Sequence, residues 1–282
     1  MIINKKRLII NIGIILIIFF GFRLYIDNNV LEVSYINFMD SEIPEEFNDT
    51  KILQLSDLHN KSYGEDNNIL LKQINDIKPD YIFLTGDMVS NADKDFTVFY
   101  SLAQKLGENY HCYYILGNHE IDLSNTQRNN IYTTLENYNI TVLDNEKIEL
   151  IKGNSKINLY GMWYNPKYYI EEEFYLENMI KIMGESENGF NILLTHNPDD
   201  FEVYANWGAD LSFSGHVHGG MIRLPFVGGL ISPNRTLFPK YDSGIYEYNK
   251  SNLVVSRGLS RGVTGARLFN KPELVVVNLK NN

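Results

Sequence analysis

Cysteine is almost absent from the sequence, which has Cys112 as its single cysteine among 282 residues. A disulfide within the chain is therefore excluded, and so is a metal site built from a cluster of thiolates. The sequence shows no internal repeat, and no low-complexity linker after residue 30.

Acidic residues are missing from residues 1–26, where Lys5, Lys6, Arg7 and Arg23 are the only charges. The remaining chain holds the other 21 basic residues and all 35 acidic ones, so its net charge is −14. A surface this acidic repels polyphosphate at long range, and we expect no binding to nucleic acid. A phosphate-processing site in such a protein needs local positive charge, which bound metal ions would supply.

The N-terminal segment contains an uncharged run, residues 8–22, and residues 8–26 would span roughly 28 Å as a helix at about 1.5 Å per residue. A cleaved signal peptide and an uncleaved anchor both fit this run, while a buried core helix is disfavoured because the run is apolar all round. No small-x-small cleavage pattern follows, so we predict a single-pass anchor in the cell membrane.

The distribution of basic residues predicts the orientation of this anchor. By the positive-inside rule the basic tip stays in the cytoplasm, and the rest of the chain lies on the extracytoplasmic side. We therefore divide the chain into residues 1–30, comprising the tip, the transmembrane signal-anchor and a short linker, and residues 31–282, one globular domain.

Short apolar runs alternate with amphipathic stretches through the predicted domain. We predict strands over residues 51–57, 81–87, 112–120 and 190–196, a hairpin over residues 147–162, and further strands within residues 243–259 and 273–280. Helices are predicted where apolar residues recur every three or four positions, over residues 70–77, 99–106, 124–138 and 176–183. This alternation predicts a layered α/β domain, and the strand-rich C-terminal half indicates a second sheet.

Polar residues with ligand chemistry follow five of the apolar runs, in the segments SDLH, TGD, GNHE, LLTHN and SGHVHGG. Five of the six histidines lie in these segments, and only His111 does not. A single histidine is more often a hydrogen-bonded core or surface residue than a ligand, but five together favour a common site. Because sites in open α/β sheets form at the carboxyl ends of strands, we expect the five segments to converge.

The side chains of these segments suit divalent metal ions such as Mn, Fe or Zn, which bind imidazole and carboxylate readily. Seven donors are available, which is too many for one tetrahedral site and suits two metal ions that share a bridging carboxylate: Asp57, His59, Asp87, Asn118, His196, His216 and His218. Two metal ions about 3.5–4 Å apart are a recurrent device for in-line displacement at phosphorus.

The ordered segments D-x-H, G-D, G-N-H-E, H and G-H-x-H resemble the calcineurin-like metallophosphoesterase family. THNPD, SGHVHGG followed by RLP, and the closing SRGL and PEL resemble its membrane-anchored or exported bacterial phosphodiesterase branch. The resemblance covers roughly residues 48–278. It implies a four-layer αββα sandwich of two mixed sheets, with the metal ions at the joint edge of the sheets.

The resemblance also implies a role for each donor. One metal ion would be held by Asp57, His59, Asp87 and His218. The second would be held by Asp87, Asn118, His196 and His216, so that Asp87 bridges the two ions. His119 is then the general acid at the leaving oxygen, and Arg267, together with Asn118, is the predicted substrate contact.

The chemistry predicted for such a site is hydrolysis of a phosphodiester or pyrophosphate bond by direct attack of a metal-bridging hydroxide. We expect the substrate to be a phosphorylated small molecule or a lipid-linked compound of the cell envelope. Two alternatives remain open: a phosphomonoesterase or phosphoprotein phosphatase on the same metal ions, and a non-catalytic binding module of the same fold. The apolar segment 221–239 is either a packed loop or a surface that meets the bilayer.

Overall fold

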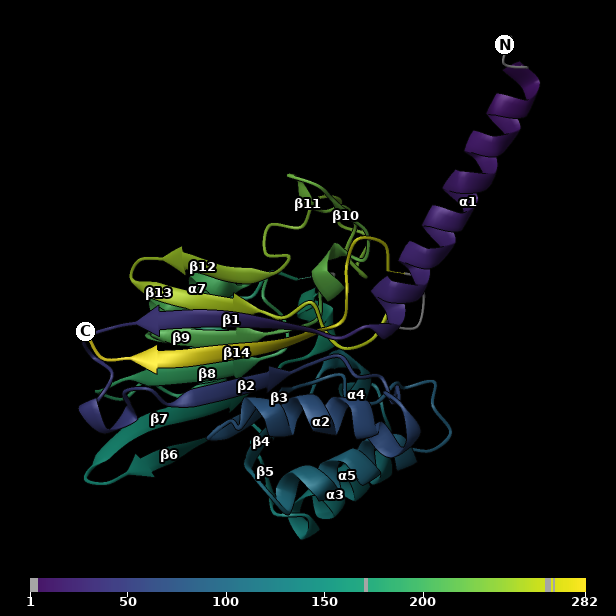
Figure 1. The fold of residues 1–282 in the computed structure, drawn as a ribbon. Coiled ribbons are helices and arrows are strands. Elements are labelled where there is room, and N and C mark those ends of the chain that lie inside the picture. The colour runs from purple at the N-terminus through teal and green to yellow at the C-terminus, as the bar shows by residue number, and fades with distance from the viewer. Residues whose placement is uncertain (1–4, 170–171, 262–264, 266) are drawn as a thin grey trace.

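The computed structural model describes residues 5–169, 172–261, 265 and 267–282. Its body is built from two six-stranded sheets that face each other (Figure 1). The first sheet has the strand order β1-β14-β2-β3-β4-β5. Its strands are β1 (Glu32–Met39), β2 (Lys51–Leu55), β3 (Tyr81–Thr85), β4 (His111–Ile115), β5 (Ile140–Val142) and β14 (Glu273–Lys280). All neighbours pair in parallel except β14 and β2, which makes this a mixed sheet.

The second sheet has the strand order β12-β13-β9-β8-β7-β6. Its strands are β6 (Glu146–Lys152), β7 (Ser155–Met162), β8 (Asn191–Thr195), β9 (Leu211–Ser214), β12 (Gly244–Tyr248) and β13 (Ser251–Val255). The four central strands are parallel, and an antiparallel strand closes each edge. Such central strands are buried on both faces, which explains their continuous apolar sequences.

Helices cover the outer face of each sheet and complete four layers. The first sheet is covered by α2 (Asn68–Ile77), α3 (Thr97–Gly107) and α5 (Asn125–Asn137), and the second by α6 (Leu176–Met183) and α7 (Phe201–Trp207). Between the sheets lies a separate apolar core, in which the rings of Phe83 on β3 and Phe213 on β9 meet edge to face at 5.2 Å. The predicted αββα sandwich is therefore confirmed.

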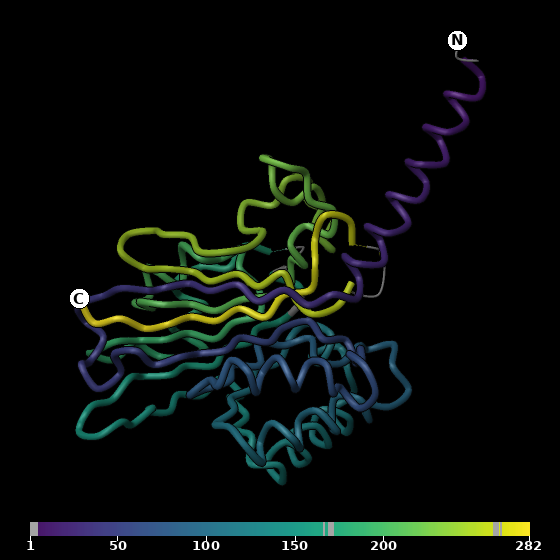
Figure 2. Tube along the Cα trace, viewed as in Figure 1, coloured from purple at the N-terminus to yellow at the C-terminus, as the bar shows by residue number. Residues whose placement is uncertain are grey.

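Most predicted elements are confirmed, including the hairpin of β6 and β7 that turns at Gly153 and Asn154. Several elements of the fold were not predicted. The strands β1, β5 and β9 and the short helices α4 (Asn118–Ile121) and α7 were missed, because they carry too few residues or too weak a period. The strand predicted over residues 112–120 ends at Ile115, and its last predicted residues belong to α4. The last strand, β14, joins the first sheet between β1 and β2 and not the second sheet, as the trace in Figure 2 shows.

The N-terminal helix α1 (Lys5–Asn29) projects away from the body of the protein (Figure 1). By length and composition it is able to cross a membrane, a test that signal sequences also meet. Its apolar residues are exposed along the helix, which excludes the buried core helix. Its last turn contacts the domain: the Asp27 carboxylate accepts from the Phe269 backbone N–H at 2.6 Å, and Asn28 exchanges two hydrogen bonds with the backbone of Arg267.

The segment 221–239 follows the last predicted metal donor and forms the small ribbon of β10 (Arg223–Leu224) and β11 (Gly228–Gly229). Five of its large apolar side chains are exposed: Leu224, Phe226, Val227, Leu237 and Phe238. The packed-loop interpretation is therefore wrong for these residues. In Figure 1 the ribbon lies on the side of the domain toward which α1 projects.

Candidate metal centre

The predicted donors follow the carboxyl ends of β2, β3, β4, β8 and β9, where the two sheets meet. Parallel strands end at one edge of a sheet, so the loops after them converge there. Five donors have positive backbone φ angles between 44° and 67°: Asp57, His59, Asp87, His216 and His218. Left-handed backbone is unfavourable for such residues and is concentrated at functional sites.

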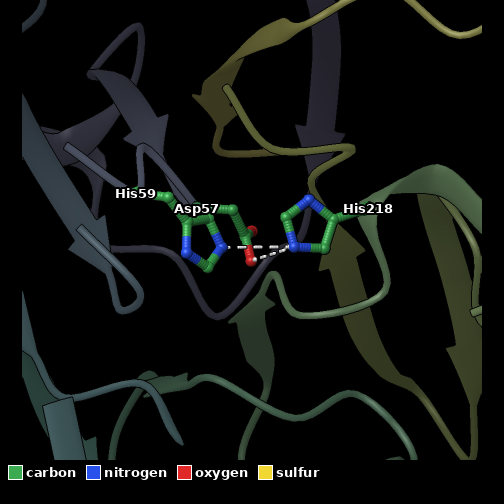
Figure 3. Close-up of side chains that lie close together, drawn as sticks. All are labelled: Asp57, His59 and His218. Atoms are coloured by element: carbon green, nitrogen blue, oxygen red, sulfur yellow. Dashed lines mark hydrogen bonds and ion pairs between the residues drawn. The ribbon is translucent and has the colours of Figure 1, made fainter. Parts of the chain in front are cut away.

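One group of donors consists of Asp57, His59 and His218 (Figure 3). The Nε2 atom of His218 lies 3.4 Å from Asp57 Oδ1 and 3.3 Å from His59 Nε2. The ligand atoms of the group lie within 4.8 Å of one another, so a single ion could contact all three side chains.

A second group consists of Asp87, His196 and His216, whose ligand atoms also lie within 4.8 Å of one another. The Nε2 atom of His196 lies 3.2 Å from Asp87 Oδ2. Asp87 also reaches the first group, because the same oxygen lies 3.8 Å from His59 Nε2. One carboxylate therefore stands between two sets of imidazoles, as a bridging ligand requires.

Asn118 begins the short helix α4, directly after β4. Its Oδ1 atom is buried and has no hydrogen-bond partner among the described residues. Burying an amide oxygen without a partner costs free energy, and a cation would satisfy this oxygen. The chemistry of the donor set and this orphaned oxygen fit divalent ions.

Backbone carbonyls orient two of the imidazoles. The Nδ1 atom of His196 lies 2.8 Å from the Thr85 carbonyl, and that of His218 lies 3.0 Å from the Ser260 carbonyl. Because a carbonyl only accepts, each Nδ1 carries a proton, and Nε2 is the nitrogen that faces the cluster. The backbone N–H of His216 donates to both oxygens of Asp57 at 3.2 Å and fixes that carboxylate.

Burial and the two carboxylates set the protonation of the site. Burial lowers the pKa values of His59, His216 and His218 to about 3, so these rings are neutral and able to act as ligands. Burial opposes the charged forms of Asp87 and His196, but their mutual attraction outweighs it: the pKa of Asp87 lies well below its ordinary value and that of His196 rises to about 10. The charged form of the buried Asp87 carboxylate is therefore stabilised by positive charge beside it.

Glu120, the third residue of α4, is fully buried behind the cluster. One of its carboxylate oxygens accepts from the backbone N–H groups of Asp87 and Gly117, each at 2.8 Å, and the other accepts from those of Met88 and Val89 at 2.7 and 3.1 Å. A single side chain thus joins the loop after β3 to the loop after β4. Glu120 therefore has a supporting role in the candidate metal centre.

His119 lies on α4 with its Nε2 atom 4.0 Å from Asp87 Oδ2 and its ring half-buried at the edge of the cluster. Its Nδ1 atom lies 3.1 Å from the Asn91 side-chain oxygen and 3.3 Å from the Asn91 backbone nitrogen. Asn91 in turn donates to Asp122 at 3.3 Å. Asn91, which follows the TGD segment in the MVSN loop, was not predicted as a partner of His119.

A second residue that sequence reasoning missed is Asn234, in the segment 221–239. Its Nδ2 atom lies 2.9 Å from His216 Nε2. No signal in the sequence distinguishes this asparagine from other loop asparagines. The contact brings the exposed apolar segment against the candidate metal centre.

Arg267 occupies a different position from the one predicted. Its side chain is 1% exposed, and its three nitrogens donate to backbone carbonyls, including those of Ser260 and Gly258. This arrangement supports a loop and does not favour the predicted contact with a substrate phosphate. Arg257 forms ion pairs with Glu32 and Glu273 at 2.9 and 2.8 Å, and Arg261 is exposed.

Comparisons with known proteins agree with this geometry. The calcineurin-like phosphoesterase family model matches residues 50–220, which contain every predicted metal donor and His119. The metallophosphoesterase YkuE of Bacillus subtilis (strain 168) is 31% identical, over 93% of this chain and 90% of its own. The phosphodiesterase YaeI of Escherichia coli (strain K12) is 29% identical, over 81% of this chain and 82% of its own.

A further relative is the UDP-2,3-diacylglucosamine pyrophosphatase LpxG of Chlamydia muridarum (strain MoPn / Nigg), which is 24% identical over 90% of each chain. The family match covers more than half of the sequence and includes the whole of the candidate metal centre. The chain therefore belongs to the calcineurin-like phosphoesterase family and is a metal-dependent phosphoric ester hydrolase.

Proposed function

We propose that the chain hydrolyses phosphodiester or pyrophosphate bonds at a centre of two divalent metal ions, taken from Mn, Fe and Zn. The observation that carries the proposal is the position of Asp87 between two sets of imidazoles. Asp57, His59, Asp87 and His218 would hold one ion. Asp87, Asn118, His196 and His216 would hold the other.

Charge supports the binding of an anionic phosphate at the metal centre. Two divalent ions exceed the charge of the two carboxylates and leave the centre positive inside a protein whose net charge is −10. When bound, such ions lower the pKa of a coordinated water toward neutrality and neutralise charge on the phosphoryl oxygens. The Asn118 amide group, at the start of α4, lies where it can contact the same oxygens.

His119 is the proposed general acid. In its protonated form the ring donates from Nδ1 to the Asn91 side-chain oxygen and presents Nε2–H to the leaving oxygen. After Nε2 has lost its proton, the neutral ring keeps the proton on Nδ1 and still donates it to the Asn91 side-chain oxygen. The Asn91 side-chain oxygen is therefore a hydrogen-bond partner of the ring in both protonation states, which keeps the imidazole in position throughout the reaction.

The proposed location is the outer face of the cell membrane, with α1 as the uncleaved anchor. Basic residues at the tip of α1, together with the absence of a cleavage pattern, support this orientation. The exposed apolar residues of the segment 221–239 would then meet the headgroup region on the side of the domain from which α1 projects. A lipid-linked cell-envelope substrate would reach the metal centre from that surface, and the pyrophosphatase name of LpxG agrees with such a substrate.

The test is an assay of the full chain in detergent micelles with bis(p-nitrophenyl) phosphate and with p-nitrophenyl phosphate. Chelator should abolish hydrolysis, and Mn, Fe or Zn should restore it. We expect the diester to have the higher kcat/KM. Activity that survives chelation contradicts the metal centre, while a preference for the monoester favours a phosphomonoesterase instead.

A further inference from the structure

A cavity of about 370 Å³ opens between the last turn of α1 and the candidate metal centre. It is lined by Asn28 and Asn29 at the end of α1, by His59 and Lys61 after β2, and by Ser260 and Arg261. His59 belongs to the cavity wall and to the candidate metal centre alike. The cavity therefore lies on the side of the metal centre that faces α1.

Two cations line this cavity, in a protein that is strongly acidic overall. Like-charge repulsion from Arg261 and Arg267 acts on the Lys61 ammonium, which places three basic groups in one neighbourhood. Within the described ranges, no carboxylate lies at ion-pair distance from Lys61 or Arg261. Such a concentration of positive charge without an acidic partner favours an anionic ligand.

The contacts of Lys61 leave part of its ammonium available. The Nζ atom donates to the Asn28 carbonyl and to the Tyr63 hydroxyl at 3.0 Å. An ammonium has three N–H donors, and these two contacts use two of them. The Asn28 contact also fixes Nζ at the end of α1, so the remaining donor is held in place before a ligand binds.

We propose that Lys61 and Arg261 bind a second phosphate group of the substrate, the one that is not attacked, in the cavity between α1 and the metal centre. This inference rests on the proposed function, because it takes the metal centre as the position of the scissile phosphate. It assigns the substrate to the diphosphate diesters. If α1 crosses the membrane, the cavity lies at the membrane surface, where a lipid diphosphate would place its headgroup.

The test is equilibrium binding of non-hydrolysable diphosphonates to the Mn²⁺-loaded full chain, measured by isothermal titration calorimetry. Dimethyl methylenediphosphonate represents a soluble diphosphate diester. Dihexadecyl methylenediphosphonate in phosphatidylcholine vesicles represents a lipid that carries the same headgroup. Hexyl methylphosphonate, which has one anionic group, reports on the metal centre alone. The variants are Lys61→Gln and Arg261→Gln, with Lys72→Gln on the exposed face of α2 as the matched control.

We expect each cavity variant to weaken both diphosphonates by about tenfold to a hundredfold, the range of one charged hydrogen bond. Binding of hexyl methylphosphonate should stay within about twofold, and Lys72→Gln should change neither ligand. Because the Arg261 side chain forms no hydrogen bond or ion pair among the described residues, its variant separates ligand binding from folding. Equal losses for the single-anion and double-anion ligands would overturn the proposal, and so would unchanged binding in both variants.

Hydrolysis distinguishes this inference from the proposed function. If the wild-type chain binds the diphosphonates through Lys61 and Arg261 but hydrolyses no diester, the proposed function fails and the second phosphate site stands. If the chain hydrolyses diesters while both variants bind diphosphonates normally, the function stands and the site is refuted.

Discussion

The Nδ1 atom of His119 lies 3.1 Å from the side-chain oxygen of Asn91, a residue 28 positions earlier in the chain. The contact fixes the ring of the proposed general acid relative to the loop that carries Asp87. Asp122 holds the other end of Asn91, so the three side chains form a short chain of hydrogen bonds at the edge of the metal centre.

Replacement of His119 should slow substrates according to their leaving groups. With an alkyl leaving group, His119→Gln should lower kcat by about 10²- to 10⁴-fold, because a poor leaving group needs the proton. With p-nitrophenolate the loss should be much smaller. Asn91→Ala should produce a loss of about tenfold with the alkyl ester, equivalent to one hydrogen bond. Equal losses for both leaving groups contradict the acid role.

Replacement of the shared carboxylate should remove metal and activity together. Asp87→Asn keeps the shape of the side chain but removes the charge between the two groups of imidazoles. Loss of a residue that only supports a metal ligand costs about 10- to 100-fold in metal affinity or activity. Because Asp87 is itself a proposed ligand of both ions, its replacement should lower activity by more than about a hundredfold. Metal content, measured by inductively coupled plasma mass spectrometry after dialysis, should fall below that of the wild type. A fully metal-loaded, active Asp87→Asn protein refutes the bridging role.

Glu120→Gln should destabilise the fold. Each carboxylate oxygen of Glu120 accepts from two backbone N–H groups, so converting either oxygen to an amide leaves two buried donors without an acceptor. Each unsatisfied group costs about 1–3 kcal/mol, which predicts a loss of at least about 2 kcal/mol in the free energy of unfolding. Urea titration measures it, with Glu136→Gln on the exposed face of α5 as the control. Equal stability of the two variants contradicts this supporting role of Glu120.

Stability should depend on pH through Asp200, which lies before α7 on the outer face of the second sheet. Burial raises the pKa of this carboxyl from 3.8 to about 6, although the Tyr164 hydroxyl donates to it at 2.5 Å. A raised pKa means that the folded protein binds the proton more tightly than the unfolded chain. This contribution to stability is complete below about pH 4 and is lost as the pH rises through about 6.

The measurement is the free energy of unfolding of the wild type and of Asp200→Asn between pH 4 and pH 7. We expect the wild type to lose stability relative to the variant across this range. Asp210, whose pKa burial also raises to about 6, is present in both proteins and cancels in the comparison. Parallel profiles would show that the Asp200 carboxyl titrates normally in the folded protein.

The exposed apolar segment should contact lipid when the full chain is in a bilayer. Phe226 is fully exposed on the ribbon of β10 and β11, so Phe226→Trp makes a fluorescent reporter at its tip. We expect a blue-shifted emission and quenching by brominated phospholipid. Ile151→Trp, also exposed but on the hairpin of β6 and β7, should show neither effect. Identical spectra for the two reporters contradict membrane contact of this segment.

The parts of the fold that the sequence predicted are those with a strong local period. The helix α3 buries Phe99, Leu102, Ala103 and Leu106 on one face, which is the pattern that predicted it. The position of β14 beside β1 and β2 depends on pairing across the whole length of the chain, and no local pattern encodes such pairing. A strand order of this kind follows from tertiary packing.

The same contrast holds for the candidate metal centre. The donors were predictable because histidine, aspartate and asparagine cluster after apolar runs, and the structure brings all the predicted histidine and aspartate donors together. Asn91 and Asn234 were not predictable, because their importance comes only from which ring each one meets. Arg267 was predicted to contact substrate because it matches the closing motif of the family, whereas its guanidinium is enclosed by backbone carbonyls.

The docking of α1 has a practical consequence for making a soluble form of this enzyme. Asn28 forms hydrogen bonds with the backbone of Arg267, whose guanidinium donates to the Ser260 carbonyl. The same carbonyl orients the ring of His218. A truncation after residue 29 discards Asp27 and Asn28 and with them the first link of this series. An expression design that starts a few residues before Arg23 keeps the link and still sheds most of the apolar run. Comparing the two truncations would reveal how far metal affinity depends on a helix that never touches the metal.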